Sequence, residues 1–300
     1  MASGIGVSYA GPGLRARAPT GRRAEALATD DPPLQRLGSG RAAEVFAWDE
    51  ATAVKLSRSA DGMSSLETES AALSAARSAG IRVPAPRGFV THDGRPGLLM
   101  ERLAGDDLLG ILERQPWRVW EFGRLTGRLH AELGNTPAPA GLTDVKDALR
   151  AAIEVSSAIP DRARPRVLAL LESLPRGERL CHGDFHPGNI ILTAEGPVII
   201  DFPNALSGDP VSDFARTALL LEAGELPPDT GLWGRALTLI GRKLMLLAYR
   251  SGYRSAAPGD RELLARWRAV LVAHRLTERI PEERVRLLRM LSGALRAAGA

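Results

Sequence analysis

Three oxygen-bearing side chains lie close together in the stretch 181–202, which constrains the fold more than any other part of the sequence. Asp184 and Asn189 are five residues apart, and Asp201 follows an apolar run. Pro187 and the glycine after it disfavour a helix between the first two. The sequence therefore predicts a tight loop from which Asp184 and Asn189 can face one site.

A short hairpin is expected after this loop. The apolar runs 190–192 and 198–200 predict two strands joined by a turn, which would bring Asn189 and Asp201 together at the open end. Oxygen ligands of this kind suit Mg²⁺, and a neighbouring carboxylate such as Asp184 could orient and deprotonate a hydroxyl. Phosphoryl transfer from a nucleoside triphosphate needs little covalent chemistry from a protein, so a base and a cation site provide most of what it requires.

Three patterns in this region carry a resemblance. The pattern H-G-D-x-x-x-x-N at 182–189 resembles the catalytic loop of protein kinases, with Gly in place of Arg, and Asp-Phe at 201–202 resembles the start of their D-F-G motif. A third pattern, G-D-P-x-x-D, is present at 208–213. All three occur in this order in the aminoglycoside phosphotransferase family of small-molecule kinases, which the chain resembles more closely.

The resemblance implies roles for six residues. They are Asp184 as catalytic base, Asn189 and Asp201 as metal ligands, Asp213 as a brace of the catalytic loop from a helix, and His182 and Asp209 in supporting positions. A rival interpretation is a metal-dependent hydrolase, because His, Asp and His alternate at 182–186. The other histidines, at 92, 130 and 274, are each alone in their segments, so we expect His186 to support the loop and His130 to be packed and hydrogen-bonded.

Upstream, residues 37–46 predict two strands around a flexible turn. Gly38, Gly40 and Val45 match the glycine-rich loop G-x-G-x-x-G-x-V of kinases, with Ala43 at the third glycine. Glycine lets backbone N–H groups approach phosphate oxygens closely. We expect this turn to cover a nucleotide.

Lys55 lies in the next apolar run, 51–56, and is one of only three lysines in a chain that otherwise uses arginine. Its position matches the lysine that binds the α- and β-phosphates. Two glutamates could hold it from the following helix. Ser64 and Glu67 form a capping-box pattern that would occupy Glu67, whereas Glu69 shares the inward stripe of the helix. We therefore expect Glu69 to pair with Lys55.

The run 98–105 resembles the hinge between the lobes of these kinases. By that resemblance the backbone near Glu101 and Leu103 would bind the adenine edge, with Met100 behind it. Beyond the hinge, apolar spacing predicts helices over 108–113, 117–133, 144–157, 161–174, 231–254, 259–276 and 281–298. In the last helix, an apolar stripe is expected to pack on the rest of the helical lobe, and it consists of Val285, Leu288, Leu291 or Ser292, and Leu295.

About eight residues separate Asp201 from the helix expected at Pro210. A protein kinase needs a long activation segment there, and an arginine at position 183. The acceptor is therefore expected to be a small molecule, either an aminoglycoside-like antibiotic or a metabolite. ATP, or another nucleoside triphosphate, and Mg²⁺ are the expected cofactors.

Composition narrows the class of protein. A single cysteine excludes an internal disulfide, and no segment has the length of a membrane helix or the apolar core of a signal peptide, so a cytoplasmic protein is expected. Residues 231–300 carry 13 Arg and one Lys against five acids, a net charge of +9 that leaves −5 for residues 1–230. Few aromatics separate these arginines, which favours solvated helix faces over nucleic-acid or membrane binding.

We expect an α+β, two-lobed, protein-kinase-like fold. Residues 31–104 would form a small antiparallel-sheet lobe that binds the nucleotide, and residues 105–300 a helical lobe with the catalytic loop and acceptor site. Residues 1–30, rich in Gly, Ala, Pro and Arg, are expected to be disordered. The alternative is a non-catalytic nucleotide-binding regulator of the same fold, and the oligomeric state is left open.

Overall fold

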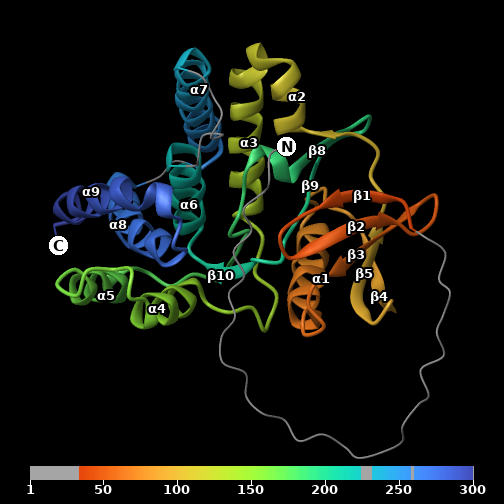
Figure 1. Cartoon of the computed structure of the whole chain (residues 1–300), viewed down its shortest axis with the longest axis horizontal. Coiled ribbons are helices and arrows are strands. Elements are labelled where there is room, and N and C mark those ends of the chain that lie inside the picture. The colour runs from red at the N-terminus through yellow and green to blue at the C-terminus, as the bar shows by residue number, and fades with distance from the viewer. Residues whose placement is uncertain (1–33, 224–231, 258–259, 300) are drawn as a thin grey trace, which may run out of the picture.

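A computed structural model describes residues 34–223, 232–257 and 260–299, and the segment 1–30 lies outside these ranges. Figure 1 shows a small lobe, made of a sheet and helix α1, beside a larger lobe that is mainly helical. The two-lobed α+β architecture predicted from the sequence is confirmed.

The small lobe is built on one antiparallel sheet with the strand order β1-β2-β3-β5-β4. The strands are β1 (Arg36–Ser39), β2 (Ala43–Ala47), β3 (Thr52–Ser57), β4 (Pro86–His92) and β5 (Arg95–Glu101). Every residue of the central strand β3 is buried. Asp93 and Gly94, which join β4 to β5, have φ values of 51° and 70°, as a two-residue hairpin turn requires.

Helix α1 (Met63–Ser78) packs on this sheet, but its start differs from the prediction. Gly62 is the N-cap residue, and no side chain accepts a hydrogen bond there. The predicted capping box of Ser64 and Glu67 is wrong, because the helix already begins at Met63 and Ser64 therefore lies inside its first turn.

The large lobe contains most of the helices and two small sheets, ordered β6-β8-β9 and β10-β7. Its elements are β6 (Asp106–Asp107), α2 (Leu108–Arg114), η1 (Pro116–Arg118), α3 (Val119–Leu133), α4 (Val145–Val155), α5 (Arg164–Ser173), β7 (Arg179–Cys181), η2 (Pro187–Asn189), β8 (Ile190–Thr193), β9 (Gly196–Ile199), β10 (Leu206–Gly208), α6 (Pro210–Ala223), α7 (Leu232–Ala256), α8 (Arg261–Thr277) and α9 (Pro281–Ala297).

One apolar core runs across both lobes. It joins Leu73 and Leu98 of the small lobe to Phe122, Phe185 and Phe202 of the large one. Phe185 directly follows Asp184 of the predicted catalytic loop, and Phe202 directly follows Asp201 of the predicted metal site. The same core therefore anchors the loop and the end of the hairpin that follows it.

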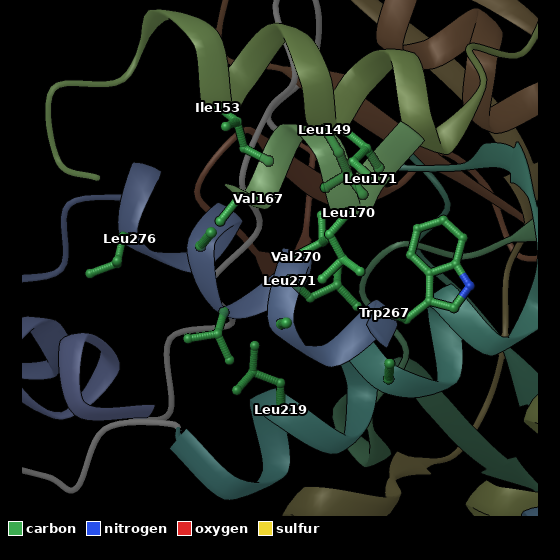
Figure 2. Close-up of a cluster of buried hydrophobic side chains, with 14 of the residues drawn as sticks. Leu149, Ile153, Val167, Leu170, Leu171, Leu219, Trp267, Val270, Leu271 and Leu276 are labelled. Carbon is green, nitrogen blue, oxygen red and sulfur yellow. The ribbon is translucent and has the colours of Figure 1, made fainter. Parts of the chain in front are cut away.

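A second core holds the helices of the large lobe together. Figure 2 shows Leu149 from α4, Leu171 from α5, Leu219 from α6, and Trp267 and Val270 from α8 meeting in this cluster. The consequence for the site is that α6 is fixed against α8, on the side of α6 that does not face the small lobe.

Helix α9 packs on α8, although with a face that differs from the predicted stripe. Leu291 and Leu295 are buried and Leu288 is half-buried, as predicted. Val285, however, is 60% exposed, and Leu287 takes an inner position that was not predicted. The i, i+4 spacing of Leu287, Leu291 and Leu295 keeps them on one side of the helix, whereas Val285 is rotated away from them. Within the described ranges, no helix is long and apolar enough to cross a membrane.

Candidate active site

The loop after β7 is held from α6 by one carboxylate. Asp213 accepts hydrogen bonds from the backbone N–H of His182 at 2.6 Å and of Gly183 at 3.0 Å, and its carboxylate also lies 2.9 Å from Nε2 of His130. Burial raises the pKa of Asp213, but His130 and these hydrogen bonds outweigh burial and hold that pKa below its usual value. Asp213 is therefore an ionised acceptor at the position where the sequence predicted a brace.

Gly183 occupies a position where only glycine fits. Its φ is +78°, and a Cβ atom there would lie 2.3 Å from the backbone oxygen of Asn204. This contact explains why the chain has glycine where protein kinases have arginine. The neighbouring ring of His182 places Nε2 3.0 Å from the carbonyl oxygen of Ile200 and Nδ1 3.3 Å from the N–H of Asp184, so it joins the loop to the hairpin.

Asp184 follows in this loop and is 5% exposed. Burial raises the pKa of its carboxyl group, and the nearby His186 and Arg216 oppose that shift. A carboxylate with a raised pKa is a stronger base than a solvated one. The position is therefore suited to accepting a proton from a hydroxyl.

The hairpin β8–β9 brings Asn189 and Asp201 together, as predicted. The N–H of Ile200 donates to the carbonyl oxygen of Asn189 at 3.0 Å, and the Asn189 side-chain NH₂ donates to the carbonyl oxygen of Asp184 at 2.9 Å. Among the described residues, the side-chain oxygen of Asn189 has no hydrogen-bond donor and is available to another partner. Asp201 has a φ of +69°, a strained backbone conformation for a residue other than glycine that is typical of functional sites.

Lys55 meets two carboxylates between the lobes. Its Nζ lies 2.6 Å from Glu69 on α1 and 2.5 Å from Asp201 after β9. Burial alone would lower the pKa of Lys55, but the two carboxylates outweigh it and raise that pKa above its usual value. The predicted pairing of Lys55 with Glu69 is confirmed, and Glu69 also accepts the N–H of Phe202 at 3.2 Å.

The glycine-rich turn starts in register with Lys55. Gly38 pairs with Val45 across β1 and β2, and Val45 pairs with Lys55 across β2 and β3. Residues directly opposite each other in a sheet project to the same face, so Val45 and Lys55 lie side by side. Gly40 closes the turn through its N–H, which donates to the carbonyl oxygen of Ala43 at 2.9 Å.

The hinge residues end β5. Met100 is buried in the core that spans the lobes, and the N–H of Glu101 donates to the carbonyl oxygen of Ala85 at 2.9 Å. Among the described residues, the N–H of Leu103 makes no hydrogen bond. Leu103 therefore has a free backbone donor just after β5, whereas the N–H of Glu101 is used within the small lobe.

A family model described as "Phosphotransferase enzyme family" matches residues 33–243, more than two thirds of the chain. The chain belongs to the phosphotransferase enzyme family. The predicted resemblance is thereby confirmed, and the matched range contains Lys55, Asp184, Asn189, Asp201 and Asp213.

Two curated relatives of this chain are streptomycin 6-kinases from Streptomyces glaucescens and Streptomyces griseus, each 32% identical. Each match covers 42% of this chain and 43% of the relative, so the matched part spans less than half of the curated relatives. Solved structures share the fold across nearly the whole chain. An aminoglycoside phosphotransferase APH(4)-Ia with ADP and hygromycin B is 13% identical, with a TM-score of 0.59 over 90% of this chain and 95% of that one.

A second solved structure is that of APH(2")-IIia with GDP and kanamycin. It is 18% identical, with a TM-score of 0.54 over 88% of this chain and 93% of that one. At these identities the likeness establishes the fold of the phosphotransferase family and no more.

Two further residues, Asp209 and His130, are placed as predicted in this family fold. Asp209 caps α6, since its Oδ1 accepts the N–H of Val211 at 2.9 Å, and its Oδ2 accepts the indole N–H of Trp267 at 3.0 Å. His130 is stacked on Phe185 and lies 2.7 Å from the Tyr249 hydroxyl. Both are supporting positions in a packed interior.

His186 supports the loop from within, as predicted, because its Nδ1 accepts the N–H of Gly188 at 3.1 Å. Both ring nitrogens of His182 face backbone groups. The alternation of histidine and aspartate at 182–186 therefore serves to shape the loop, which removes the basis for a hydrolytic transition-metal site.

Sequence reasoning missed one group beside the loop. Arg216 on α6 is 7% exposed, and its Nε donates to the carbonyl oxygen of Gly183. Arg275, one of the C-terminal arginines expected on a solvated face, is 2% exposed and paired with Glu283, so that expectation was wrong for this residue. One feature of the sequence could have identified Arg216 as a neighbour of the loop. It lies three residues after Asp213, which is about one helical turn along the same face of α6.

Proposed function

We propose that this chain transfers the γ-phosphoryl group of ATP, or of another nucleoside triphosphate, to a hydroxyl group of a small molecule in a Mg²⁺-dependent reaction. The observation that carries the proposal is the convergence of Lys55, Asp184, Asn189 and Asp201 on one site between the lobes. These residues come from β3, the loop after β7 and the two ends of the hairpin β8–β9.

Each residue has a defined part in this proposal. Lys55, held by Glu69, would bind the phosphates from the small lobe, beneath the turn that contains Gly38 and Gly40. Asp184 would orient the acceptor hydroxyl and take its proton as the bond to phosphorus forms.

The cation site fits the same chemistry. The free side-chain oxygen of Asn189 and the carboxylate of Asp201 are hard oxygen donors, and the Asp201 side chain is 40% exposed. Mg²⁺ held by Asn189 and Asp201 would neutralise phosphate charge and position the leaving group. Because the Asn189 side-chain NH₂ is bonded to the Asp184 backbone, the same residue would link the position of the cation to that of the base.

The names of the relatives suggest an acceptor class. Two are streptomycin 6-kinases, and the solved structures include complexes with kanamycin and hygromycin B. We propose an aminoglycoside-like compound or another hydroxylated small molecule as the acceptor. The last 70 residues carry a net charge of +9, which favours testing neutral and anionic acceptors beside the cationic antibiotics.

The experiment is a coupled ATPase and phosphotransfer assay with Mg²⁺ across a panel of streptomycin, kanamycin, hygromycin B and neutral or anionic hydroxylated compounds. We expect acceptor-dependent turnover by the native chain, and for Asp184→Asn a loss on the order of a thousandfold with nucleotide affinity retained. Nucleotide binding without turnover on any acceptor would favour the non-catalytic regulator. Undiminished turnover by Asp184→Asn would remove that residue from the mechanism.

A further inference from the structure

The peptide bond between Gly183 and Asp184 is held at both of its polar atoms. Its carbonyl oxygen accepts a hydrogen bond from Nε of Arg216, and its N–H lies 3.3 Å from Nδ1 of His182. A rotation of this peptide plane would break both contacts and would carry the side chain of Asp184 with it. The orientation of the proposed base is therefore fixed partly by a residue on α6.

Arg216 is itself held from the far side. Its NH1 lies 3.3 Å from Oε1 of Glu278 and 3.4 Å from Nδ1 of His274. Burial, followed by the positive charges of Arg216 and Arg275, lowers the pKa of His274 well below its usual value. The His274 ring is thus neutral, and its Nδ1 can accept from the guanidinium.

The contacts continue to the start of α9. Glu278, whose side chain is 2% exposed, also pairs with Arg275. Arg275 in turn makes a bidentate pair with Glu283, with both N···O distances at 2.8 Å. A continuous row of buried charges therefore runs from the catalytic loop, through α6, to the corner between α8 and α9.

Stability alone does not account for such a row. The free energy needed to remove several charges from water can equal or exceed the free energy gained from their attraction. Proteins in which apolar residues of similar volume replace buried ion pairs are often equally stable. The row does provide a fixed position for the Nε of Arg216, because a fork held at one end by a carboxylate has little freedom at the other. The row of buried charges therefore fixes the geometry of the loop more than it adds to stability.

We propose that Arg216 is a positioning residue for Asp184, and that Glu278 at the α8–α9 corner sets where Arg216 lies. The inference rests on the proposed role of Asp184 as the base. Displacing a catalytic group by about 1 Å can cost about a hundredfold in rate. Breaking the row should therefore lower kcat while leaving nucleotide binding intact, since Arg216 holds the loop of the proposed base, whereas Lys55 is held by Glu69 and Asp201.

The experiment compares Arg216→Met, Arg216→Lys and Glu278→Gln with a matched control, Arg268→Met. Arg268 joins α8 to α6 through a bidentate pair with Glu222, at 2.8 and 3.0 Å. Among the described residues, it makes no hydrogen bond to the catalytic loop. We expect Arg216→Met to lower kcat about ten- to a hundredfold with the KM for nucleotide unchanged, and Arg216→Lys to restore part of the loss. The control should lower the melting temperature but keep kcat.

A double-mutant cycle then tests the link to the corner. If Glu278 acts through Arg216, the effects of Arg216→Lys and Glu278→Gln on kcat will be non-additive. If Arg216→Met fails to fold, Arg216→Lys and Glu278→Gln test the positioning role instead. In each of them, a lower kcat with an unchanged KM for nucleotide would support it.

Two outcomes would overturn the proposal. One is a folded Arg216 variant with kcat within twofold of the native value, and the other is an equal loss of kcat in Arg268→Met. Asp184→Asn separates this failure from that of the proposed function. Loss of turnover in Asp184→Asn together with normal turnover in the Arg216 variants rejects only the positioning role, whereas turnover retained in Asp184→Asn rejects the role of the base itself.

Discussion

His182 is fully buried, and burial lowers the pKa of its ring to about 4 despite the opposing charge of Asp213. In the unfolded chain the ring has its ordinary pKa of about 6.5. Between these two pKa values, the His182 ring is therefore protonated in the unfolded state and neutral in the folded state. The contribution to stability is complete above about pH 6.5 and is lost as the pH falls toward 4.

We predict that the free energy of unfolding of the native chain falls by roughly 2 kcal/mol more than that of His182→Gln between pH 7 and pH 5. Glutamine can keep the donor to the Ile200 carbonyl without a titrating ring. The measurement is urea denaturation of both proteins across this range. Parallel pH profiles for the two proteins would contradict the assigned burial cost.

Lysine usage shows how far single residues can be read from the sequence. The scarcity of lysine indicated that Lys55 has a special task, and its contacts agree with this. Lys146 is also buried, yet its Nζ donates to the carbonyl oxygens of Glu172 and Leu174 at the end of α5. A buried lysine therefore has two different roles in this chain. In the sequence, only the surrounding motif distinguishes the two lysines, because it is present at Lys55 and absent at Lys146.

Helices α3 and α7 meet through glycines. A Cβ atom on Gly127 would lie 2.2 Å from the carbonyl oxygen of Tyr249, which belongs to the backbone of α7 and cannot move alone. We predict that Gly127→Ala lowers the free energy of unfolding by roughly 1–3 kcal/mol, even though alanine favours helices. Thermal and urea denaturation measure the change.

Gly241 on α7 is the matched control, because a Cβ atom there would meet nothing within 4 Å. Gly241→Ala should raise the free energy of unfolding by up to about 1 kcal/mol through helix propensity. Opposite signs for the two substitutions are the expected result. A stabilising Gly127→Ala would show that the two helices can separate at little cost.

Local patterns predicted the elements better than their ends and faces. The strands and helices follow from apolar spacing, but the start of α1 does not, since Gly62 and Met63 carry no sequence signal as strong as that of Ser64 and Glu67. In α9, Val285 and Leu287 fit an apolar stripe equally well, and contact with α8 decides between them. The difference in α9 arises from a packing partner that lies outside the local segment.

At the scale of the whole molecule, the motifs predicted which residues meet but not what surrounds them. Lys55 and Asp201 are 146 positions apart and still pair, because each lies in a pattern whose partner is known. The row from Arg216 to Glu283 has no such pattern. Its members were indistinguishable from surface charges until α6, α8 and α9 enclosed them.

The pairing of Lys55 with Asp201 joins the two lobes, so the proposed nucleotide site would draw on residues of both. A ligand that binds only the folded state at a hundred times its Kd stabilises it by about 2.7 kcal/mol. We predict that Mg²⁺ with a non-hydrolysable ATP analogue raises the melting temperature of the native chain, and that Lys55→Met and Asp201→Asn each abolish the rise. Differential scanning fluorimetry and calorimetric titration give the two measurements.

Lys146→Met supplies the control for this test. It removes the other buried lysine, whose contacts lie at the end of α5 and away from the site, so it should lower the melting temperature without ligand and keep the ligand-dependent rise. A rise that persists in Lys55→Met would mean that the nucleotide is held by one lobe alone. An equal rise of the melting temperature without Mg²⁺ would mean that Asp201 and Asn189 hold no cation. The ion pair between Lys55 and Asp201 would then join the lobes without taking part in nucleotide binding.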